Sequence, residues 1–170
     1  GKASAAVVVD LHGGAWNNGD LTGCQARDEV LAEAGFAVAA LDFRQAEDGY
    51  PTSLIDINYA IRWLKGHAEE FGIDPARVGM SGQSSGGHLA MLAAMRPQDP
   101  RYTEIVLDID APSIDATVKC VGMMWPVVNP LSRYRHALRS RASTSPGDWV
   151  GNLPESHDRY WVTEENMAEG

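Results

Sequence analysis

The chain has 170 residues, 44% hydrophobic and 22% charged, which is typical of one globular domain with a buried core. Its formal net charge of −9 argues against nucleic acid and anionic membrane surfaces as partners, because like charges repel. No apolar run reaches the length of a membrane span and no export signal is visible, so we expect a cytoplasmic protein. The two cysteines, Cys24 and Cys120, are too few for a disulfide framework and are expected to be reduced thiols.

Apolar runs of strand length alternate along the chain with segments of helical periodicity, a pattern typical of βαβ units on a parallel sheet. The expected strands cover residues 5–11, 36–43, 78–81 and 118–125. The expected helices cover residues 27–34, a segment that begins after Pro51, residues 85–95 and residues 131–141. The sequence therefore predicts an α/β fold with a four-stranded parallel sheet and flanking helices. The first two strands are expected to be buried.

Apolar side chains in these segments form the predicted core. The helix after Pro51 carries a stripe at helical spacing, formed by Leu54, Ile57, Ile61 and Leu64. The helix over residues 85–95 is expected to face the sheet with Leu89, Leu92 and Met95. The end of the fourth strand is expected to bury Met123, Met124 and Trp125.

The motif His12-Gly13-Gly14-Ala15-Trp16 directly follows the first expected strand. Two adjacent glycines let the backbone approach a bound ligand closely and present N–H groups to a developing oxyanion. A simple turn after the strand is the alternative interpretation. Asp10, near the end of this otherwise apolar strand, needs a buried partner that the sequence does not identify.

The strongest signal is Gly82-Gln83-Ser84-Ser85-Gly86, a G-x-S-x-G motif between the third expected strand and the helix after it. A tight turn there forces the serine into strained backbone geometry and exposes its hydroxyl at the carboxyl edge of the sheet. The first backbone N–H groups of the helix then lie near any negative charge that develops. Ser84 is the predicted nucleophile. A glycine-rich junction without catalytic role is the alternative, and the His-Gly-Gly motif upstream disfavours it.

Two further segments extend these motifs into a family pattern, namely Asp42-Phe43-Arg44 and residues 72–78, Gly-Ile-Asp-Pro-Ala-Arg-Val. Together with His-Gly-Gly-x-Trp and Gly-x-Ser-x-Gly-Gly-His, they make the chain resemble the hormone-sensitive-lipase-like esterases and their HGGxW relatives. These are carboxylesterases of the α/β-hydrolase superfamily. The resemblance runs from about residue 5 to residue 92 and continues weakly through Trp125-Pro126.

This resemblance implies an α/β-hydrolase fold and an oxyanion hole formed by Gly13, Gly14 and Ser85. The family usually has Asp-Tyr-Arg where this chain has Asp-Phe-Arg. We expect Asp42 and Arg44 to form an ion pair that belongs to the scaffold.

Three further residues lie near the motifs. His12 is expected to brace the oxyanion motif by hydrogen bonding rather than to act as the base, because the family order is serine, acid, histidine. His88 lies one turn into the helix after Ser84 and is expected to pack or hydrogen-bond locally. Trp16 is a candidate to line an acyl or alcohol pocket, with plain packing as the alternative.

A serine hydrolase needs a base for the hydroxyl proton and an acid that orients the base. Residues 126–170 are expected to begin a helical cap rather than to continue the core formed by residues 1–125. The usual acid and base are therefore expected beyond Gly170, and the chain is interpreted as an interior fragment cut at both ends. The alternative is a compact variant whose base and acid come from His157 or His136 with Asp148 or Asp158.

The sequence thus predicts a lipase-like serine hydrolase that cleaves a small-molecule carboxylic ester through an acyl-serine intermediate. No metal and no organic cofactor is implied. An amidase-type hydrolase, such as an arylformamidase or a peptidase, is an alternative because the same turn serves both bonds. A non-catalytic α/β-hydrolase-like binding module is the other alternative. Oligomeric state and acyl length are left open.

Overall fold

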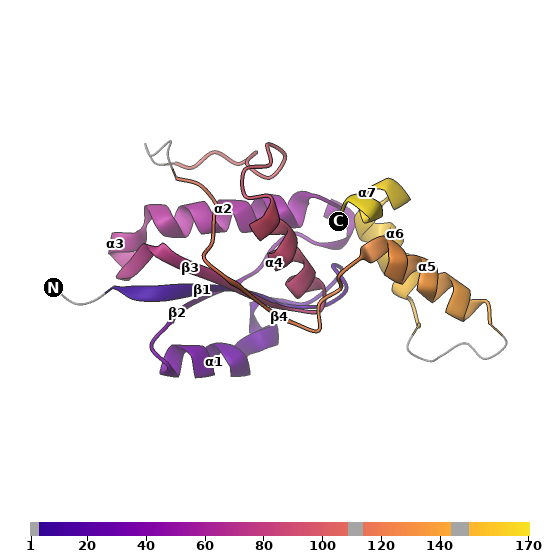
Figure 1. The fold of residues 1–170 in the computed structure, drawn as a ribbon, viewed down its shortest axis with the longest axis horizontal. Helices are drawn as coiled ribbons and strands as arrows, with labels where there is room; N and C mark the ends of the chain where they lie inside the picture. The colour runs from indigo at the N-terminus through magenta and orange to yellow at the C-terminus, as the bar shows by residue number, and fades with distance from the viewer. Residues whose placement is uncertain (1–3, 109–113, 144–149) are drawn as a thin grey trace.

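The computed structural model describes residues 4–108, 114–143 and 150–170. Within these ranges, four parallel strands form one sheet in the order β2-β1-β3-β4 (Figure 1). The strands are β1 (Ala5–Leu11), β2 (Ala37–Leu41), β3 (Ile73–Gln83) and β4 (Val121–Met124). The helices are η1 (Leu21–Cys24), α1 (Gln25–Glu33), η2 (Ala46–Asp48), α2 (Thr52–Gly66), α3 (Ala68–Phe71), α4 (Ser85–Met95), α5 (Pro130–Arg141), α6 (Leu153–Trp161) and α7 (Glu164–Glu169).

The connections between strands place a switch point at the centre of the sheet. The chain leaves β1 through α1 to β2 on one side, then returns through α2 across β1 to β3 on the other side. In Figure 1, α1 lies on one face of the sheet, and α2 and α3 lie on the opposite face. In open parallel sheets, ligands bind at the carboxyl ends of the strands where the order reverses. The ends of β1 and β3 are therefore the expected location of the site.

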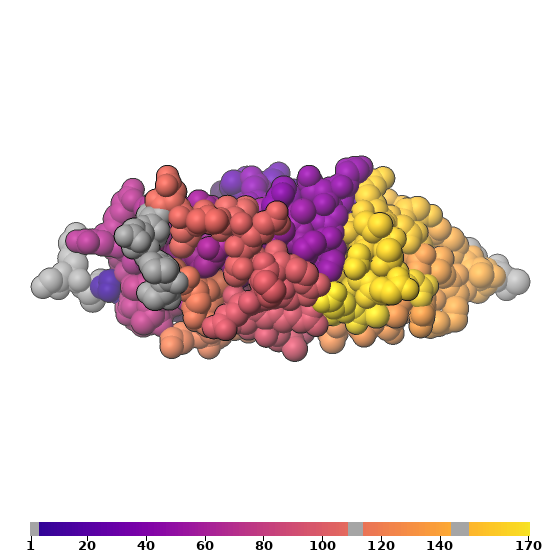
Figure 2. Space-filling model, turned by 90° about the horizontal axis from the view of Figure 1, so that it is seen from above, coloured from indigo at the N-terminus to yellow at the C-terminus, as the bar shows by residue number. Residues whose placement is uncertain are grey.

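The last three helices extend the molecule beyond those carboxyl ends. Helices α5, α6 and α7 lie past the end of the sheet (Figure 1), and their orange and yellow surface forms one end of the elongated molecule in Figure 2. Below we call them the C-terminal helices. No helix in the described parts of the chain combines the length and apolarity required to cross a membrane.

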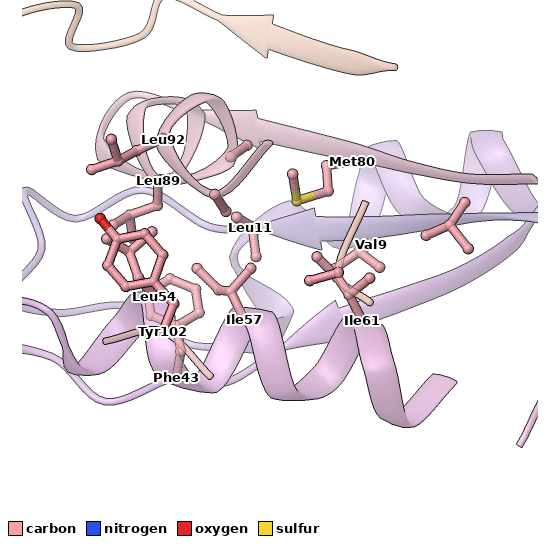
Figure 3. Close-up of a cluster of buried hydrophobic side chains, with 14 of the residues drawn as sticks. Val9, Leu11, Phe43, Leu54, Ile57, Ile61, Met80, Leu89, Leu92 and Tyr102 are labelled. Carbon is pink, nitrogen blue, oxygen red and sulfur yellow. The ribbon is translucent and has the colours of Figure 1, made fainter. Parts of the chain in front are cut away.

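The core lies between α2 and the sheet (Figure 3). Leu54, Ile57 and Ile61 of α2 are fully buried and point toward Val9 and Leu11 of β1. Leu64, the last member of the predicted stripe, is partly buried against the same core. The prediction of an amphipathic helix after Pro51 is confirmed.

The burial predictions for Met95, Met123, Trp125 and β2 were wrong, each for a geometric reason. Met95 is 71% exposed, because six helical residues after Leu89 the side chain has rotated about 120° away from the face that meets the sheet. Met123 and Trp125 are also exposed, because β4 is an edge strand with β3 as its neighbour and no second strand beside it in the described chain. The second strand, β2, lies at the other edge and is only partly buried.

The predicted ion pair between Asp42 and Arg44 is not formed. Asp42 accepts a hydrogen bond from the backbone N–H of Leu21 at 2.7 Å, whereas Arg44 pairs with Asp56 of α2 at 2.8 Å. The chain has left β2 before both residues, so their side chains turn toward different elements. The two cysteines are unpaired as predicted, with Cys24 buried and Cys120 exposed.

Candidate active site

Ser84 lies in a strained turn between the last residue of β3 and the first residue of α4. Its backbone angles, φ 52° and ψ −121°, fall in a region that residues with a Cβ rarely adopt. Its N–H donates to the carbonyl of Met124 at 3.0 Å, and its own carbonyl accepts from the N–H groups of His88 and Val127, both at 3.2 Å. These bonds hold the strained conformation from three directions, as the G-x-S-x-G motif predicts.

Two glycines of this turn leave no room for a side chain. A Cβ at Gly82 would lie 2.5 Å from the carbonyl oxygen of Gly86. A Cβ at Gly86 would lie 2.2 Å from the carbonyl oxygen of His12. The first turn of α4 therefore packs directly against the backbone that follows β1. After the roles predicted for them, we call residues 82–86 the nucleophile elbow and residues 12–16 the oxyanion loop.

The oxyanion loop passes directly over the nucleophile elbow. A Cβ at Gly13 would lie 3.3 Å from the Cβ of Ser84, so a side chain at this position would press against the nucleophile. Gly14 adopts φ +119° and a Cβ there would lie 1.8 Å from the carbonyl oxygen of Asn18, which restricts this position to glycine. Ser85 is buried at the first position of α4. The structure thus brings all three predicted oxyanion residues to the switch point beside Ser84.

His12 braces the oxyanion loop as the sequence predicts. Its Nδ1–H donates to the carbonyl of Gly13 at 2.7 Å, and its ring stacks on Phe43 with centroids 4.4 Å apart. The side chain is buried. These contacts give His12 a structural role.

Trp16 connects the oxyanion loop to the C-terminal helices. Only 1% of its surface is exposed, and its ring stacks on Tyr160 and meets His157 and Trp161 edge-on, with centroids 6.0, 5.0 and 5.5 Å away. Packing, one of the two interpretations left open by the sequence, is what the structure shows. A role for Trp16 in lining a substrate pocket stays a prediction.

Asn17 adds a polar contact that the sequence analysis missed. Its Nδ2 donates to the carbonyls of Ala15 and of Ser156 in α6, both at 2.7 Å. The sequence carries no signal for the second bond, because its partners lie 139 residues apart. Asn17 and Trp16 together dock α6 onto the oxyanion loop.

Burial lowers the pKa of two histidines of this region. Burial lowers the pKa of His88 to about 4, and its ring lies edge-on to Trp16 and Trp161, so local packing is confirmed. Burial also lowers the pKa of His157, whose Nδ1–H donates to the carbonyl of Leu153 at 2.7 Å. Of the other residues named for a compact triad, His136 and Asp158 are exposed on α5 and α6, and Asp148 lies outside the described residues. That alternative stays a prediction.

The sequence analysis also missed the buried partner of Asp10. It is Arg27 of α1, whose Nη2 lies 2.7 Å from Oδ2 of Asp10. A signal was present, since Arg27 is the sole lysine or arginine between Asp10 and Asp42. A buried carboxylate needs a cation, and the sequence offers one in the crossover helix next to it.

Comparisons with known proteins agree with this geometry. The BD-FAE family model matches residues 1–163. The probable carboxylic ester hydrolase LipM of Mycobacterium tuberculosis is 39% identical over 166 residues, which cover 91% of this chain and 38% of LipM. The chain therefore spans well under half of the length of this relative.

Two solved structures share the fold. An inhibited esterase B from Lactobacillus rhamnosis is 25% identical with a TM-score of 0.74, over 98% of this chain and 50% of that one. Thermogutta terrifontis esterase 2 phosphorylated by paraoxon is 28% identical with a TM-score of 0.58, over 76% of this chain and 48% of that one. The family match and the structural likeness agree with the parallel sheet described above: the chain belongs to the BD-FAE family and has the α/β-hydrolase fold.

Proposed function

We propose that the protein containing this chain hydrolyses small carboxylic esters, with Ser84 as the nucleophile. The observation that carries this proposal is the strained Ser84 backbone beside Gly13 of the oxyanion loop, where an added Cβ would lie 3.3 Å from the Cβ of Ser84. In such a turn the hydroxyl attacks the ester carbonyl carbon and forms an acyl-serine, the alcohol leaves, and water then releases the acid. The names of LipM and of the two structural relatives, all ester hydrolases or esterases, support the ester class.

Charge develops on the carbonyl oxygen when the tetrahedral intermediate forms. The proposed donors to this oxygen are the backbone N–H groups of Gly13, Gly14 and Ser85. Ser85 begins α4, so the positive end of the helix dipole also favours the oxyanion. Because these donors belong to the backbone, their direction is set by the turn and the glycines rather than by mobile side chains.

The base and its acid are proposed to come from residues outside this 170-residue chain. Three of its histidines have structural contacts: His12 holds Gly13, His88 packs against Trp16, and His157 donates to its own helix. The match covers 38% of LipM, so most of that relative's sequence lies outside the matched part and has room for the base and the acid. We also propose that residues 126–170 begin a cap over the site, since the C-terminal helices lie past the carboxyl ends of the strands.

A cytoplasmic location is proposed as well. Cys24 and Cys120 are both unpaired, which suits a reducing compartment. The acidic net charge of −9 agrees with a small-molecule substrate rather than with nucleic acid.

The test of the function is labelling with a fluorophosphonate, applied to the protein as its gene encodes it and read by intact mass. The relative phosphorylated by paraoxon shows that an organophosphorus probe suits this fold. We expect one adduct on Ser84, and none in a Ser84→Ala control. A folded protein that gains no adduct would contradict the proposal and favour a binding module.

Paired substrates then separate an esterase from an amidase. We expect p-nitrophenyl acetate to be hydrolysed and p-nitroacetanilide to be left nearly untouched under the same conditions. Comparable rates on both would instead support the amidase alternative. Loss of both activities in Ser84→Ala assigns them to the same serine.

A further inference from the structure

A largely buried network of side chains lies next to the nucleophile elbow. Arg27 donates through Nη2 to both carboxylate oxygens of Asp10, at 2.8 and 2.7 Å, and through Nε to Oδ1 at 3.2 Å. Its remaining nitrogen, Nη1, donates to Oε1 of Gln83 at 3.1 Å. The side chains of Asp10 and Arg27 are 1% and 23% exposed, so water competes weakly for these bonds. We call Asp10, Arg27 and Gln83 the Arg27 network.

The network joins the two strands that carry the proposed site. Asp10 is aligned with Ser81 in the ladder between β1 and β3, and it precedes Gly13 of the oxyanion loop by three residues. Gln83 is the last residue of β3 and directly precedes Ser84. Arg27 is therefore bonded at once to the strand that leads into the oxyanion loop and to the residue before the nucleophile.

Gln83 also lies beside the oxyanion loop. A Cβ at Gly13 would lie 3.3 Å from the carbonyl oxygen of Gln83 and 3.6 Å from its Cγ. The peptide and side chain of Gln83 thus bound the space beside Gly13. A change in the orientation of Gln83 would alter the position of Gly13 as well as that of Ser84.

If the network served only to attach α1 to the sheet, the ion pair between Asp10 and Arg27 would suffice and the bond to Gln83 would not be needed. A buried ion pair contributes little net stability relative to apolar residues of the same size. A guanidinium group differs from other cations because its donors have fixed directions, so it orients every acceptor that it binds. Here one of these donors is directed at the side chain adjacent to Ser84.

We propose that the Arg27 network positions the site. Acting through Gln83, it keeps Ser84 and the backbone of Gly13 in the relative position that acyl transfer requires. The inference rests on the proposed function and names Gln83 and Arg27 as positioning residues, since neither needs to touch the substrate. Misplacement of a reacting group by about 1 Å can reduce a rate by about a hundredfold. Loss of one oriented hydrogen bond beside the nucleophile is therefore expected to slow the reaction without unfolding the protein.

The test compares two substitutions of similar size in the protein as its gene encodes it. Gln83→Met keeps the length of the side chain and its contact with Gly13 but cannot accept from Arg27. Gln83→Glu keeps the acceptor. Gln25→Met is the matched control, because Gln25 is an exposed residue of α1 that bonds to Glu29 of the same helix. The measurements are the rate of fluorophosphonate labelling, kcat and KM for p-nitrophenyl acetate, and the melting temperature.

For Gln83→Met we expect labelling and kcat to fall by about tenfold or more, with KM within about twofold of the wild type. The melting temperature should stay within about 3 °C, because the Asp10–Arg27 ion pair is intact. Gln83→Glu should recover most of the lost rate, and Gln25→Met should match the wild type. This split between kcat and KM, together with the recovery by Glu, is not expected of a residue with a merely structural role.

Two other outcomes can be told apart. A wild-type protein that reacts at Ser84, with Gln83→Met reacting equally fast, would overturn the positioning role and leave the proposed function standing. A folded wild-type protein that neither reacts with the probe nor hydrolyses the ester would contradict the proposed function, and the positioning role would fall with it.

Discussion

The oxyanion loop is held on two sides by different physical means. On the side of the sheet, it touches the nucleophile elbow through backbone atoms, at positions where a single added Cβ would overlap a carbonyl oxygen. On the side of the C-terminal helices, it is held by the buried ring of Trp16 among the rings of α6. The first contact tolerates no added atom, whereas the second depends on how much apolar surface is buried. Substitutions should therefore distinguish the two sides sharply.

One added methyl group should disrupt the contact between the oxyanion loop and the nucleophile elbow. Gly86→Ala would place a Cβ 2.2 Å from the carbonyl oxygen of His12 and 2.4 Å from that of Leu11, and both are backbone atoms that cannot rotate away. We expect a loss of more than about 4 kcal/mol in the free energy of unfolding, or no folded protein. Urea denaturation measures this loss.

Gly122→Ala is the matched control in the same sheet. A Cβ there would meet only the carbonyl oxygen of Met80 at 3.9 Å, an ordinary contact. Its effect should stay within about 1 kcal/mol. Equal stability of the Gly86→Ala and Gly122→Ala proteins would show that the close packing of elbow and loop does not exist.

Removal of the Trp16 ring should disrupt the contact between the oxyanion loop and α6. Trp16→Ala should reduce the free energy of unfolding by about 3–5 kcal/mol, the usual range for a buried aromatic residue. The damage should be local, with faster amide hydrogen exchange in α6 than in β1 and β3. Trp125→Ala is the control, because Trp125 is 74% exposed, and its effect should be within about 0.5 kcal/mol. Uniformly faster exchange in the sheet and in α6 would contradict separate attachment of the two sides.

The same difference explains what could be predicted from the sequence. The bounds of β1 (Ala5–Leu11) and α4 (Ser85–Met95) were predicted to the residue, because an apolar run and a glycine-flanked motif are local signals. The strained turn at Ser84 was predicted for the same reason. The geometry of a strand-to-helix turn is encoded by residues that are neighbours in the chain.

Contacts between distant segments could not be predicted in the same way. The bond from Asn17 to the carbonyl of Ser156 and the docking of Trp16 on α6 depend on how far apart elements pack, which no local pattern encodes. Asp42 and Arg44 failed as a pair because each side chain found a partner on another element. The edge position of β4, which exposes Trp125, is likewise a property of the whole sheet.

Acid pH should reduce the stability of the protein through His88, whose ring packs against Trp16 on the side of the C-terminal helices. Its pKa in the folded protein is about 4, below the ordinary value of 6.5, because burial disfavours the charged ring. The unfolded chain therefore binds the proton first, and stability falls as the pH drops from 6.5 toward 4. The largest loss from this group is about 3 kcal/mol, at about 1.4 kcal/mol per pH unit.

His88→Leu tests this contribution. Its packing cost does not depend on pH, so the free energies of unfolding of wild type and variant should converge by about 3 kcal/mol or less between pH 7 and pH 4. Guanidinium titrations at several pH values measure the difference. A constant difference across this range would mean that His88 does not titrate with unfolding.

The charged contacts on the side of the sheet should respond to pH with the opposite sign and a smaller effect. Burial, with the negative charge of Asp10 next, raises the pKa of Asp28 to about 6. The folded protein then holds this proton more tightly than the unfolded chain, so the contribution of Asp28 to stability falls as the pH rises from about 4 through 6. Asp28→Asn, which stays neutral, should be more stable than the wild type at pH 7. The gain should be only about 1 kcal/mol, because solvent at this partly exposed site screens the charge of Asp28. At pH 3.5 this difference should vanish. Equal stability of Asp28→Asn and wild type at pH 7 would mean that folding does not raise the pKa of Asp28.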